Sequence, residues 1–444
     1  MGRRGVEYPV FPIGLSYIAA ALKEHTVKLF DPNLYDLDQS AEILEENLKD
    51  LQPDVVGISL RNIDTVKRKD PFVYFKAIAP MVRHIKRTNP KGKIVLGGTA
   101  FSLYAKEIME RIQEIDFGVY LEGEEAIVEL LENIDSPEKV KGIFFRKNGK
   151  VCFSGKRPPP DFASLPIPEK DIVHIERYIS DRHNVIGIQS KRGCPFSCSY
   201  CTYAFLSNEK LRLRGPAHVV DEIEEMTFNY NVKWFTFTDN VFNVPEEHAR
   251  AICQELIRRK TPISWSAWLT PKGFNEELLR LMHKAGCRRI RFSPDAATNQ
   301  GLKALSKGFT TDDIDTSLQL LSKMQDIYVG YCFFCAYPKM TFSDVIQILK
   351  YTSRMSRLFR GRGDVVLGWI RIEPHTPLYH EAIREKLIDV HTTMLPEEDS
   401  QLLSLFYNPK RLFHFSFLFD LLIPSIEKEG ALWRILSAII RRFE

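Results

Sequence analysis

The stretch Lys191-Arg-Gly-Cys194-Pro-Phe-Ser-Cys198-Ser-Tyr-Cys201 decides the fold of this chain. Three residues separate the first two cysteines, and two residues separate the second from the third. A glycine and a proline beside Cys194 interrupt regular structure, so the cysteines are expected on a loop that follows a strand. Three thiolates can hold three irons of a cubane cluster and leave the fourth iron open to a small molecule. The stretch therefore predicts a 4Fe-4S cluster on Cys194, Cys198 and Cys201.

A structural zinc site is the plainer alternative for these cysteines. Such a site needs a fourth ligand close by. His183 and His218 are the nearest candidates, and neither fits a usual ligand spacing. Cluster binding is therefore the better prediction.

The composition is that of an ordinary globular protein of two or three domains. Of 444 residues, 44% are apolar and 27% charged, and the net charge of +4 does not point to nucleic acid. No apolar run reaches the roughly 18 residues that cross a bilayer, and the basic N-terminus lacks the apolar core of a secretory signal. Eight scattered cysteines do not resemble a disulfide framework, so we expect a reducing, cytoplasmic location.

The region after the cysteine loop alternates strands and helices. Six strand–helix units within about 200 residues favour a partial or complete barrel over a second open sheet, although periodicity alone does not decide between them. The expected strands are Val185–Ser190, Trp234–Thr238, Ser264–Ala267, Arg289–Ser293, Val329–Phe334 and Val365–Ile372.

The region before the cysteine loop alternates β-branched stretches with amphipathic ones, which predicts a doubly wound, Rossmann-like sheet. The chain enters near Gly14, where such a domain has normally finished its first strand. We therefore expect either a chain that starts late or a sheet that is one strand short. The expected strands are Thr26–Phe30, Val55–Leu60, Ile94–Leu96 and Phe117–Tyr120, and the expected helices are Ile13–Lys23, Ala41–Leu51, Phe75–Arg87 and Ala105–Arg111.

A proline-rich stretch separates the two regions. Five prolines between Gly155 and Asp171 favour an extended connection. The predicted organisation is a Rossmann-like domain over residues 1–150, a linker over 151–184, a barrel over 185–387 and a helical extension over 388–444.

The cysteine loop, with an aromatic Tyr200 between its last two cysteines, resembles the signature of the radical S-adenosylmethionine superfamily. The resemblance implies a partial (β/α)6 barrel of TIM type, in which S-adenosylmethionine chelates the open iron. It also implies reductive cleavage of the sulfonium to a 5′-deoxyadenosyl radical, with an electron from a donor such as flavodoxin or ferredoxin.

Polar residues stand at the carboxyl ends of several expected barrel strands, where a barrel places its site. Each of them could be only a polar strand terminus. The segment Leu302–Thr310 (LKALSKGFT) resembles the superfamily's segment near the ribose and carboxylate. The contacts with S-adenosylmethionine that the resemblance implies are Tyr200, Asp239, Asn240, Ser293, Asp295 and Arg371.

Three loops of the first domain suit a large ligand, because paired glycines let it lie close to the backbone. There is no G-x-G-x-x-G fingerprint for nicotinamide or flavin. The stretches PIGLSYIAAAL, DVVGISLRNID, KIVLGGTA and FGVYLEGEEA resemble the cobalamin-binding domain that precedes many radical S-adenosylmethionine enzymes. The implied cobalamin contacts are Pro12, Gly14, Ser59, Leu60, Arg61, Asn62, Gly97, Gly98, Thr99, Glu122 and Gly123.

The Asp-x-His-x-x-G signature, which supplies a histidine to cobalt in other cobalamin proteins, is missing here. The resemblance then implies cobalamin without a histidine ligand, with Leu60 or Arg61 facing the lower side of cobalt. An arginine there would disfavour more positive cobalt and so help methyl transfer. Alternatively, Arg61 is only paired with Asp64 or with another acidic side chain.

The C-terminal segment contains an aromatic, apolar stretch, Leu412–Ile423, and then an amphipathic helix with an apolar face from Leu432 to Phe443. This helix predicts either a peripheral membrane contact or a cap that packs over the barrel mouth. A membrane contact would favour the hypothesis of a lipid-like substrate.

Together these features predict a cobalamin-dependent radical S-adenosylmethionine enzyme. The main prediction is a methyltransferase that moves a methyl group from methylcobalamin to an unactivated carbon of a small-molecule or lipid-like substrate, after hydrogen abstraction by the 5′-deoxyadenosyl radical. A cyclase or rearrangement enzyme with the same cofactors is one alternative, and a metal-stabilised binding module is the other. No nucleic-acid partner is expected, and no protein side chain is assigned a catalytic role.

Overall fold

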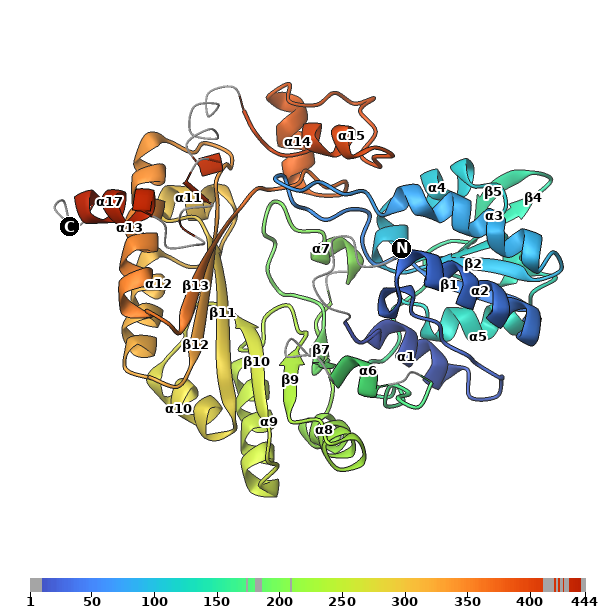
Figure 1. Cartoon of the computed structure of the whole chain (residues 1–444), viewed down its shortest axis with the longest axis horizontal. Helices are drawn as coiled ribbons and strands as arrows, with labels where there is room; N and C mark the ends of the chain where they lie inside the picture. The colour runs from blue at the N-terminus through green and yellow to red at the C-terminus, as the bar shows by residue number, and fades with distance from the viewer. Residues whose placement is uncertain are drawn as a thin grey trace.

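The computed structural model describes residues 10–172, 175–179, 186–207, 210–409, 419–420, 422–423, 426 and 431–440. Two α/β units, each built on its own sheet, make up most of this part of the chain (Figure 1). A small third sheet pairs β7 (Lys191–Arg192) with β8 (Arg212–Leu213) beside the cysteine loop. The predicted fold class, a Rossmann-like domain followed by a partial barrel, is confirmed.

The first sheet has the order β1-β2-β3-β4-β5. Its first three strands are parallel, and the last two are antiparallel to their neighbours. Its helices form where apolar residues recur at helical spacing: α3, for example, buries Ile78, Val82 and Ile85. The strands are β1 (Val55–Ser59), β2 (Lys93–Gly97), β3 (Phe117–Val119), β4 (Ile143–Lys147) and β5 (Lys150–Phe153), and the helices are α1 (Ile13–Ala21), α2 (Leu37–Leu51), α3 (Ile78–Thr88), α4 (Thr99–Arg111) and α5 (Glu124–Glu132).

Two sequence predictions for this unit need correction. Residues Thr26–Phe30 do not form a strand, because strand propensity does not suffice without a paired neighbour. The β4–β5 hairpin was missed, although its turn, Asn148-Gly149, is a strong hairpin signal. Both turn residues have positive φ, 52° and 74°. Since β5 ends at Phe153, the sheet extends past residue 150 into the predicted linker.

The second sheet has six parallel strands in the order β13-β12-β11-β10-β9-β6. Among the described residues β6 and β13 are not paired, so the barrel is partial. The strands are β6 (Ile186–Ile188), β9 (Trp234–Phe237), β10 (Ser264–Leu269), β11 (Cys287–Asp295), β12 (Tyr328–Phe334) and β13 (Gly363–Gly368). The predicted last strand runs on to Ile372, whereas β13 ends at Gly368.

Helices cover the outer side of the barrel strands, and the inner side is turned toward the first domain (Figure 1). The larger outer helices are α8 (Pro216–Tyr230), α9 (Glu246–Arg259), α10 (Glu276–Lys284), α12 (Thr311–Ser322) and α13 (Phe342–Leu358). Shorter helices are α6 (Glu176–Ile179), α7 (Tyr203–Leu206), α11 (Asn299–Ala304), α14 (Pro377–Arg384) and α15 (Asp399–Ser404).

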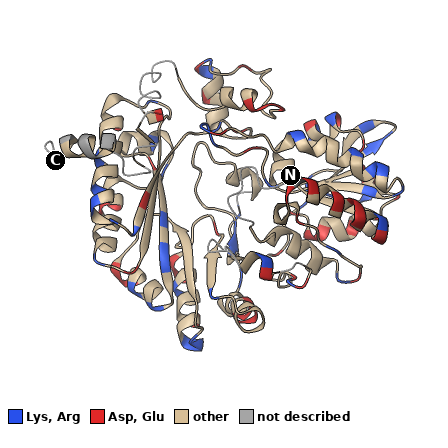
Figure 2. Ribbon diagram, viewed as in Figure 1, with Lys and Arg blue, Asp and Glu red and all other residues tan. Residues whose placement is uncertain are grey.

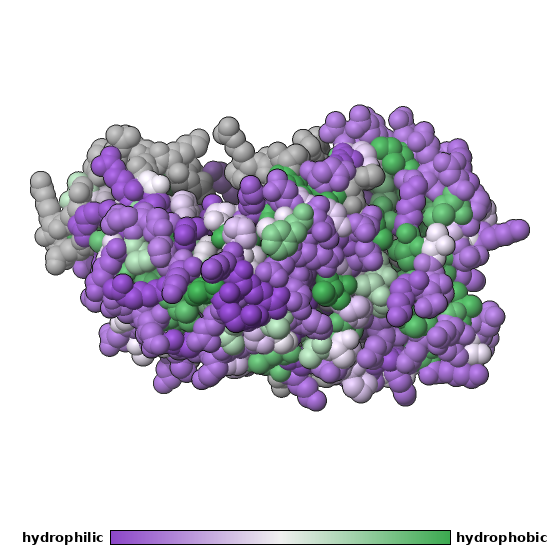
Figure 3. Space-filling model, turned by 90° about the horizontal axis from the view of Figure 1, so that it is seen from below, coloured by the Kyte–Doolittle hydropathy of each residue, from purple (hydrophilic) through white to green (hydrophobic). Residues whose placement is uncertain are grey.

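The C-terminal helix α17 (Ala431–Ile440) packs on α13. The hydroxyls of Ser437 and Ser353 are 2.8 Å apart, and Trp433 is buried. Most of the apolar stretch Leu412–Ile423, like the end of the predicted helix, lies outside the described residues. None of the described helices is long and apolar enough to span a membrane. The face in Figure 3 is mainly hydrophilic, with apolar residues in small scattered groups.

Candidate active site

The cysteine loop is held by backbone hydrogen bonds to barrel segments that are distant in sequence. The amide of Ser199 donates to the carbonyl of Leu305 at 3.0 Å, and the amide of Leu378, in α14, donates to the carbonyl of Ser199 at 2.8 Å. Gly193 has φ +95°, and a Cβ there would lie 2.1 Å from the carbonyl oxygen of Lys210. Only glycine lets the two arms of the loop pass so closely.

The cysteines are poorly solvated and lie near a lysine. Burial raises the pKa of all three thiols, that of Cys201 to about 11, and the charge of Lys307 partly opposes this rise. Iron must displace the thiol protons when it binds. Lys307 would then offset part of the negative charge of a thiolate-bound cluster.

The donor set fits a cubane. No three His, Cys, Asp or Glu side chains in the described ranges are grouped so that they could hold one metal ion. A cubane does not require such a group, because each cysteine binds a different iron. Cys194, Cys198 and Cys201 are the residues that would hold it.

Two predicted contacts of S-adenosylmethionine meet beside the cysteines. Tyr200 and Lys307 both donate hydrogen bonds to the same oxygen of Asp295, and the lysine nitrogen is 3.2 Å from the phenol oxygen. Asp295 and Lys307 are almost completely buried. Lys307 was not among the predicted site residues, although it lies in the LKALSKGFT segment. Ser293, two residues earlier on β11, lies near the Cys332 thiol and partly opposes the rise in its pKa that burial causes.

Asp239 and Asn240 hold the entry to the cysteine loop. The Asp239 carboxylate accepts the amides of Ser190 at 2.8 Å and Lys191 at 3.2 Å. The side-chain amide of Asn240 donates to the carbonyl of Gly193 at 3.3 Å. In the structure both side chains therefore position this backbone, and their contact with S-adenosylmethionine stays a prediction.

Arg371 lies in a buried network between the two units. Its Nε donates to Asp64 at 2.8 Å, and one Nη donates to Glu373 at 3.0 Å. Tyr104, in α4, donates to the same oxygen of Glu373 at 2.9 Å. Since Asp64 is taken by Arg371, Arg61 is not its partner.

The predicted cobalamin contacts line the carboxyl edge of β1, β2 and β3. Ser59, Arg61, Asn62 and Thr99 are exposed there, and Gly14 is exposed at the start of α1. The loops are tied together: the amide of Leu60 donates to Gly97, and the hydroxyl of Thr99 donates to the carbonyl of Arg61, both at 2.8 Å.

Gly98 lets two loops of this edge approach each other closely. It has φ +99°, and a Cβ there would lie 2.6 Å from the carbonyl oxygen of Leu60. Polar side chains beside backbone that carries no side chain fit a large ligand such as cobalamin.

Arg61 lies near the residues that follow the cysteine loop. Burial raises the pKa of Tyr203, just after Cys201, and the charge of Arg61 lowers it, which places the two side chains near each other. Within the described part of the chain, Arg61 has no ion pair. Its contact with cobalamin stays a prediction.

Glu122, another predicted cobalamin contact, has partners within the protein. Its carboxylate accepts hydrogen bonds from Arg192 at 2.8 Å and from Arg212, the residues that pair β7 with β8. Glu124 also pairs with Arg192, at 2.6 Å. The loop after β3 is thus bound directly to the entry of the cysteine loop.

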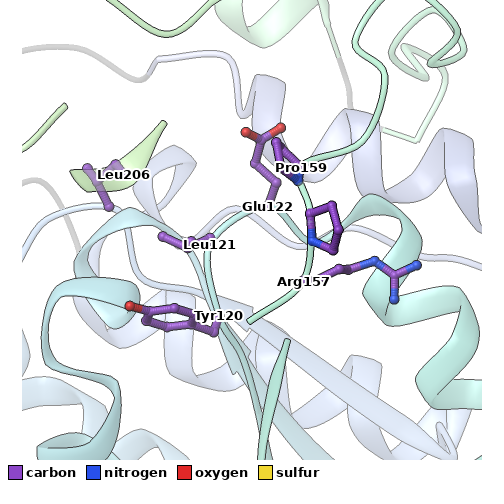
Figure 4. A pocket seen from close by; sticks show the side chains of 7 residues that line it. Tyr120, Leu121, Glu122, Arg157, Pro159 and Leu206 are labelled. Atoms are coloured by element: carbon purple, nitrogen blue, oxygen red, sulfur yellow. The ribbon is translucent and has the colours of Figure 1, made fainter. Parts of the chain in front are cut away.

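The same loop touches the exit of the cysteine loop. Tyr120 packs edge-on against Phe205 in α7, with ring centroids 6.3 Å apart, and Phe205 stacks on His375 at 4.0 Å. Figure 4 shows a small pocket at this junction, with Glu122 directed away from Arg157. Its lining comes from the loop after β3, the linker and α7: Tyr120, Leu121, Glu122, Arg157, Pro158, Pro159 and Leu206.

Comparison with known families agrees with both sites. The Radical SAM superfamily profile matches residues 188–352, and the B12-binding domain profile matches residues 3–131. The chain is therefore a radical S-adenosylmethionine enzyme. The cobalamin domain in front of the barrel defines the group more narrowly: the chain belongs to the cobalamin-binding radical S-adenosylmethionine enzymes, whose cofactors are the 4Fe-4S cluster, S-adenosylmethionine and cobalamin.

Curated relatives are distant. An uncharacterized methyltransferase of Pyrococcus horikoshii is 26% identical over 78% of this chain and 73% of its own length. An anaerobic magnesium-protoporphyrin IX monomethyl ester cyclase of Rubrivivax gelatinosus is 28% identical over 70% of this chain, but only 56% of its own length is covered. A hopanoid C-3 methylase of Methylococcus capsulatus is 23% identical over 67% of this chain and 55% of its own length.

Two solved structures share the fold. The radical S-adenosylmethionine methyltransferase TsrM of Kitasatospora setae, with tryptophan and a S-adenosylmethionine analogue bound, has a TM-score of 0.74 and 21% identity, over 86% of this chain and 75% of TsrM. OxsB, with aqua-cobalamin and S-adenosylmethionine bound, has a TM-score of 0.69 and 18% identity, over 90% of this chain and 62% of OxsB.

Proposed function

We propose that this chain is a methyltransferase that methylates an unactivated carbon of a small molecule. When bound, its cofactors supply the methyl group and the radical that removes a substrate hydrogen. The observation that carries the proposal is the contact of one cobalamin-domain loop with both ends of the cysteine loop. Glu122 binds Arg192 before the cysteines, and Tyr120 packs on Phe205 after them.

The protein's own share of the reaction is positioning. Asp239 and Asn240 hold the entry of the cysteine loop, and Lys307 balances charge next to it. The contacts of Glu122 with Arg192 and of Arg371 with Asp64 join the two cofactor regions. Such preorganisation is what a reaction between bound cofactors and substrate requires.

Methyltransferase names among the relatives support this proposal, and so does the fold shared with TsrM. Cyclisation without methyl transfer is the second candidate, because magnesium-protoporphyrin cyclases are similar over 70% of the chain.

An acceptor-free labelling experiment distinguishes the two candidates. The protein is reconstituted anaerobically with iron, sulfide and cobalamin, reduced, and given S-adenosylmethionine with a labelled methyl group. If the protein is a methyltransferase, we expect the label in the protein-bound cobalamin fraction. Formation of 5′-deoxyadenosine without any label in that fraction supports the cyclase, and zinc bound in place of iron overturns both.

We further propose flavodoxin or ferredoxin as the electron donor and the cytoplasm as the location. All eight cysteines are free in the structure, as a reducing compartment requires. No nucleic-acid partner is proposed. The membrane contact of the C-terminal helix is the weaker of the two predictions for it, because α17 buries Trp433 within the fold and bonds to α13.

A further inference from the structure

The inner face of the barrel strands carries arginines and aromatic rings. On β11, Ile290 and Phe292 are buried on the outer side, while Arg289 and Arg291 alternate with them and point inward. The strand register places Arg289 between Ser266 and Tyr328, and Arg291 between Trp268 and Gly330. We call six residues of this face the inner wall: Trp234, Trp268, Arg289, Arg291, Tyr328 and Asp364.

Aromatic rings flank both guanidinium groups. The guanidinium carbon of Arg289 is 5.7 Å from the ring centre of Trp234 and 4.9 Å from that of Tyr328. That of Arg291 is 5.8 Å from the ring of Trp268. Cation–π contacts at these distances favour a guanidinium position beside the rings, where its N–H groups can still bind an anion.

The charges of the two arginines are balanced differently. Arg291 donates to Asp364 at 2.8 Å, so its charge is compensated. Arg289 is exposed, and in the described part of the chain no carboxylate pairs with it. The inner wall therefore carries one uncompensated positive charge. Branched apolar residues usually fill a barrel interior, so two arginines here are not explained by packing.

The inner wall is continuous with the cofactor region. Strand β11 runs from Arg289 through Arg291 and Ser293 to Asp295, which binds Tyr200 of the cysteine loop. At about 3.3 Å per residue, the Cα atoms of Arg291 and Arg289 lie roughly 13 and 20 Å from that of Asp295. Figure 2 shows basic residues on β11, on the sheet that faces the first domain.

We propose that the inner wall binds the anionic end, a carboxylate or a phosphate, of the enzyme's substrate. Arg289 is the residue that binds the anion, and Trp234, Trp268 and Tyr328 contact the adjoining apolar or aromatic body. The reacting carbon then lies between the anion and the cysteine loop, within the roughly 20 Å that separate Arg289 from Asp295 along the strand. The inference rests on the proposed function and adds the substrate's chemical class.

The test compares three probes of equal body on the anaerobically reconstituted holoenzyme: 6-phenylhexanoate, 6-phenylhexyl phosphate and the neutral 6-phenylhexanol. Calorimetry measures their dissociation constants for the wild type and for Arg289→Gln, Arg289→Lys and Arg288→Gln. Arg288 is the matched control, because it lies one position away and its guanidinium donates to the carbonyls of His283 and Cys287 on the outer side.

We expect at least one anion to bind the wild type about tenfold or more tightly than the alcohol, as a charge-assisted hydrogen bond would produce. Arg289→Gln should remove that preference, Arg289→Lys should keep part of it, and Arg288→Gln should keep all of it. Which anion is preferred identifies the head group.

The inference is overturned if the alcohol binds the wild type as tightly as both anions, or if Arg288→Gln loses the preference as completely as Arg289→Gln. Cluster absorbance, cobalamin content and S-adenosylmethionine cleavage are recorded on the same wild-type sample. Wild-type protein that holds both cofactors and cleaves S-adenosylmethionine, but shows no anion preference, refutes only the proposal that the inner wall binds an anion. Wild-type protein that fails to hold the cluster or cobalamin refutes the proposed function. The probe titrations then still test whether the inner wall binds an anion.

Discussion

Replacing Arg371 by methionine separates two roles for this residue. The sequence predicts a contact with S-adenosylmethionine, whereas the structure shows a link between the domains. The guanidinium donates to Asp64 at 2.8 Å, to Glu373 at 3.0 Å and to the carbonyls of Ile372 and Met394 at 2.8 and 2.7 Å. A methionine fills similar space and makes none of these bonds.

The expected loss of unfolding free energy follows from the burial of the ion pair. The side chains of Arg371 and Asp64 are 1% and 2% exposed, so the variant leaves an unpaired carboxylate in the interior. Removing one partner of a buried ion pair costs about 3–5 kcal/mol of unfolding free energy. Asp64→Asn should cost a similar amount, and the double variant should cost much less than the sum, because both changes break one interaction.

Urea unfolding and cofactor titration measure the two roles. Arg280→Met is the control: Arg280 forms an exposed ion pair with Glu276, so its loss should change stability by no more than about 1 kcal/mol. If Arg371→Met unfolds like Arg280→Met, the link between the domains is not stabilising. If Arg371→Met loses S-adenosylmethionine binding while Asp64→Asn keeps both binding and stability, the sequence prediction holds and the structural role is refuted.

Three further predictions concern the cluster, the cobalamin edge and pH. Cys198→Ala should lose iron and cluster absorbance, whereas Cys152→Ala should retain both. Gly98→Ala should lower stability by about 1–3 kcal/mol and weaken cobalamin retention, because its Cβ would meet the carbonyl of Leu60 at 2.6 Å; unchanged retention contradicts this. Burial lowers the pKa of His248 to about 4, so the unfolded chain takes up its proton first as the pH falls. From pH 7 to 5 the wild type should then lose about 2 kcal/mol that His248→Gln does not lose, measured by urea unfolding.

The sequence by itself determined the elements whose signals are local. The spacing of Cys194, Cys198 and Cys201 is set by their positions along the chain and does not depend on the fold. The cluster loop is therefore recognisable from the sequence. The alternation of short strand-forming stretches with helical ones located the six barrel strands. The hairpin at Asn148-Gly149 has an equally local signal, two turn residues that favour positive φ.

Only the tertiary structure decided which polar groups meet. Glu122 pairs with Arg192, 70 residues away, a partner that the sequence did not predict. Arg371 pairs with Asp64, 307 residues away. No periodicity encodes such contacts, because they arise only when two separate sheets dock and bury opposite charges together. The exposure of Arg289 is likewise a property of the partial barrel, and strand alternation alone could not have distinguished it from a surface arginine.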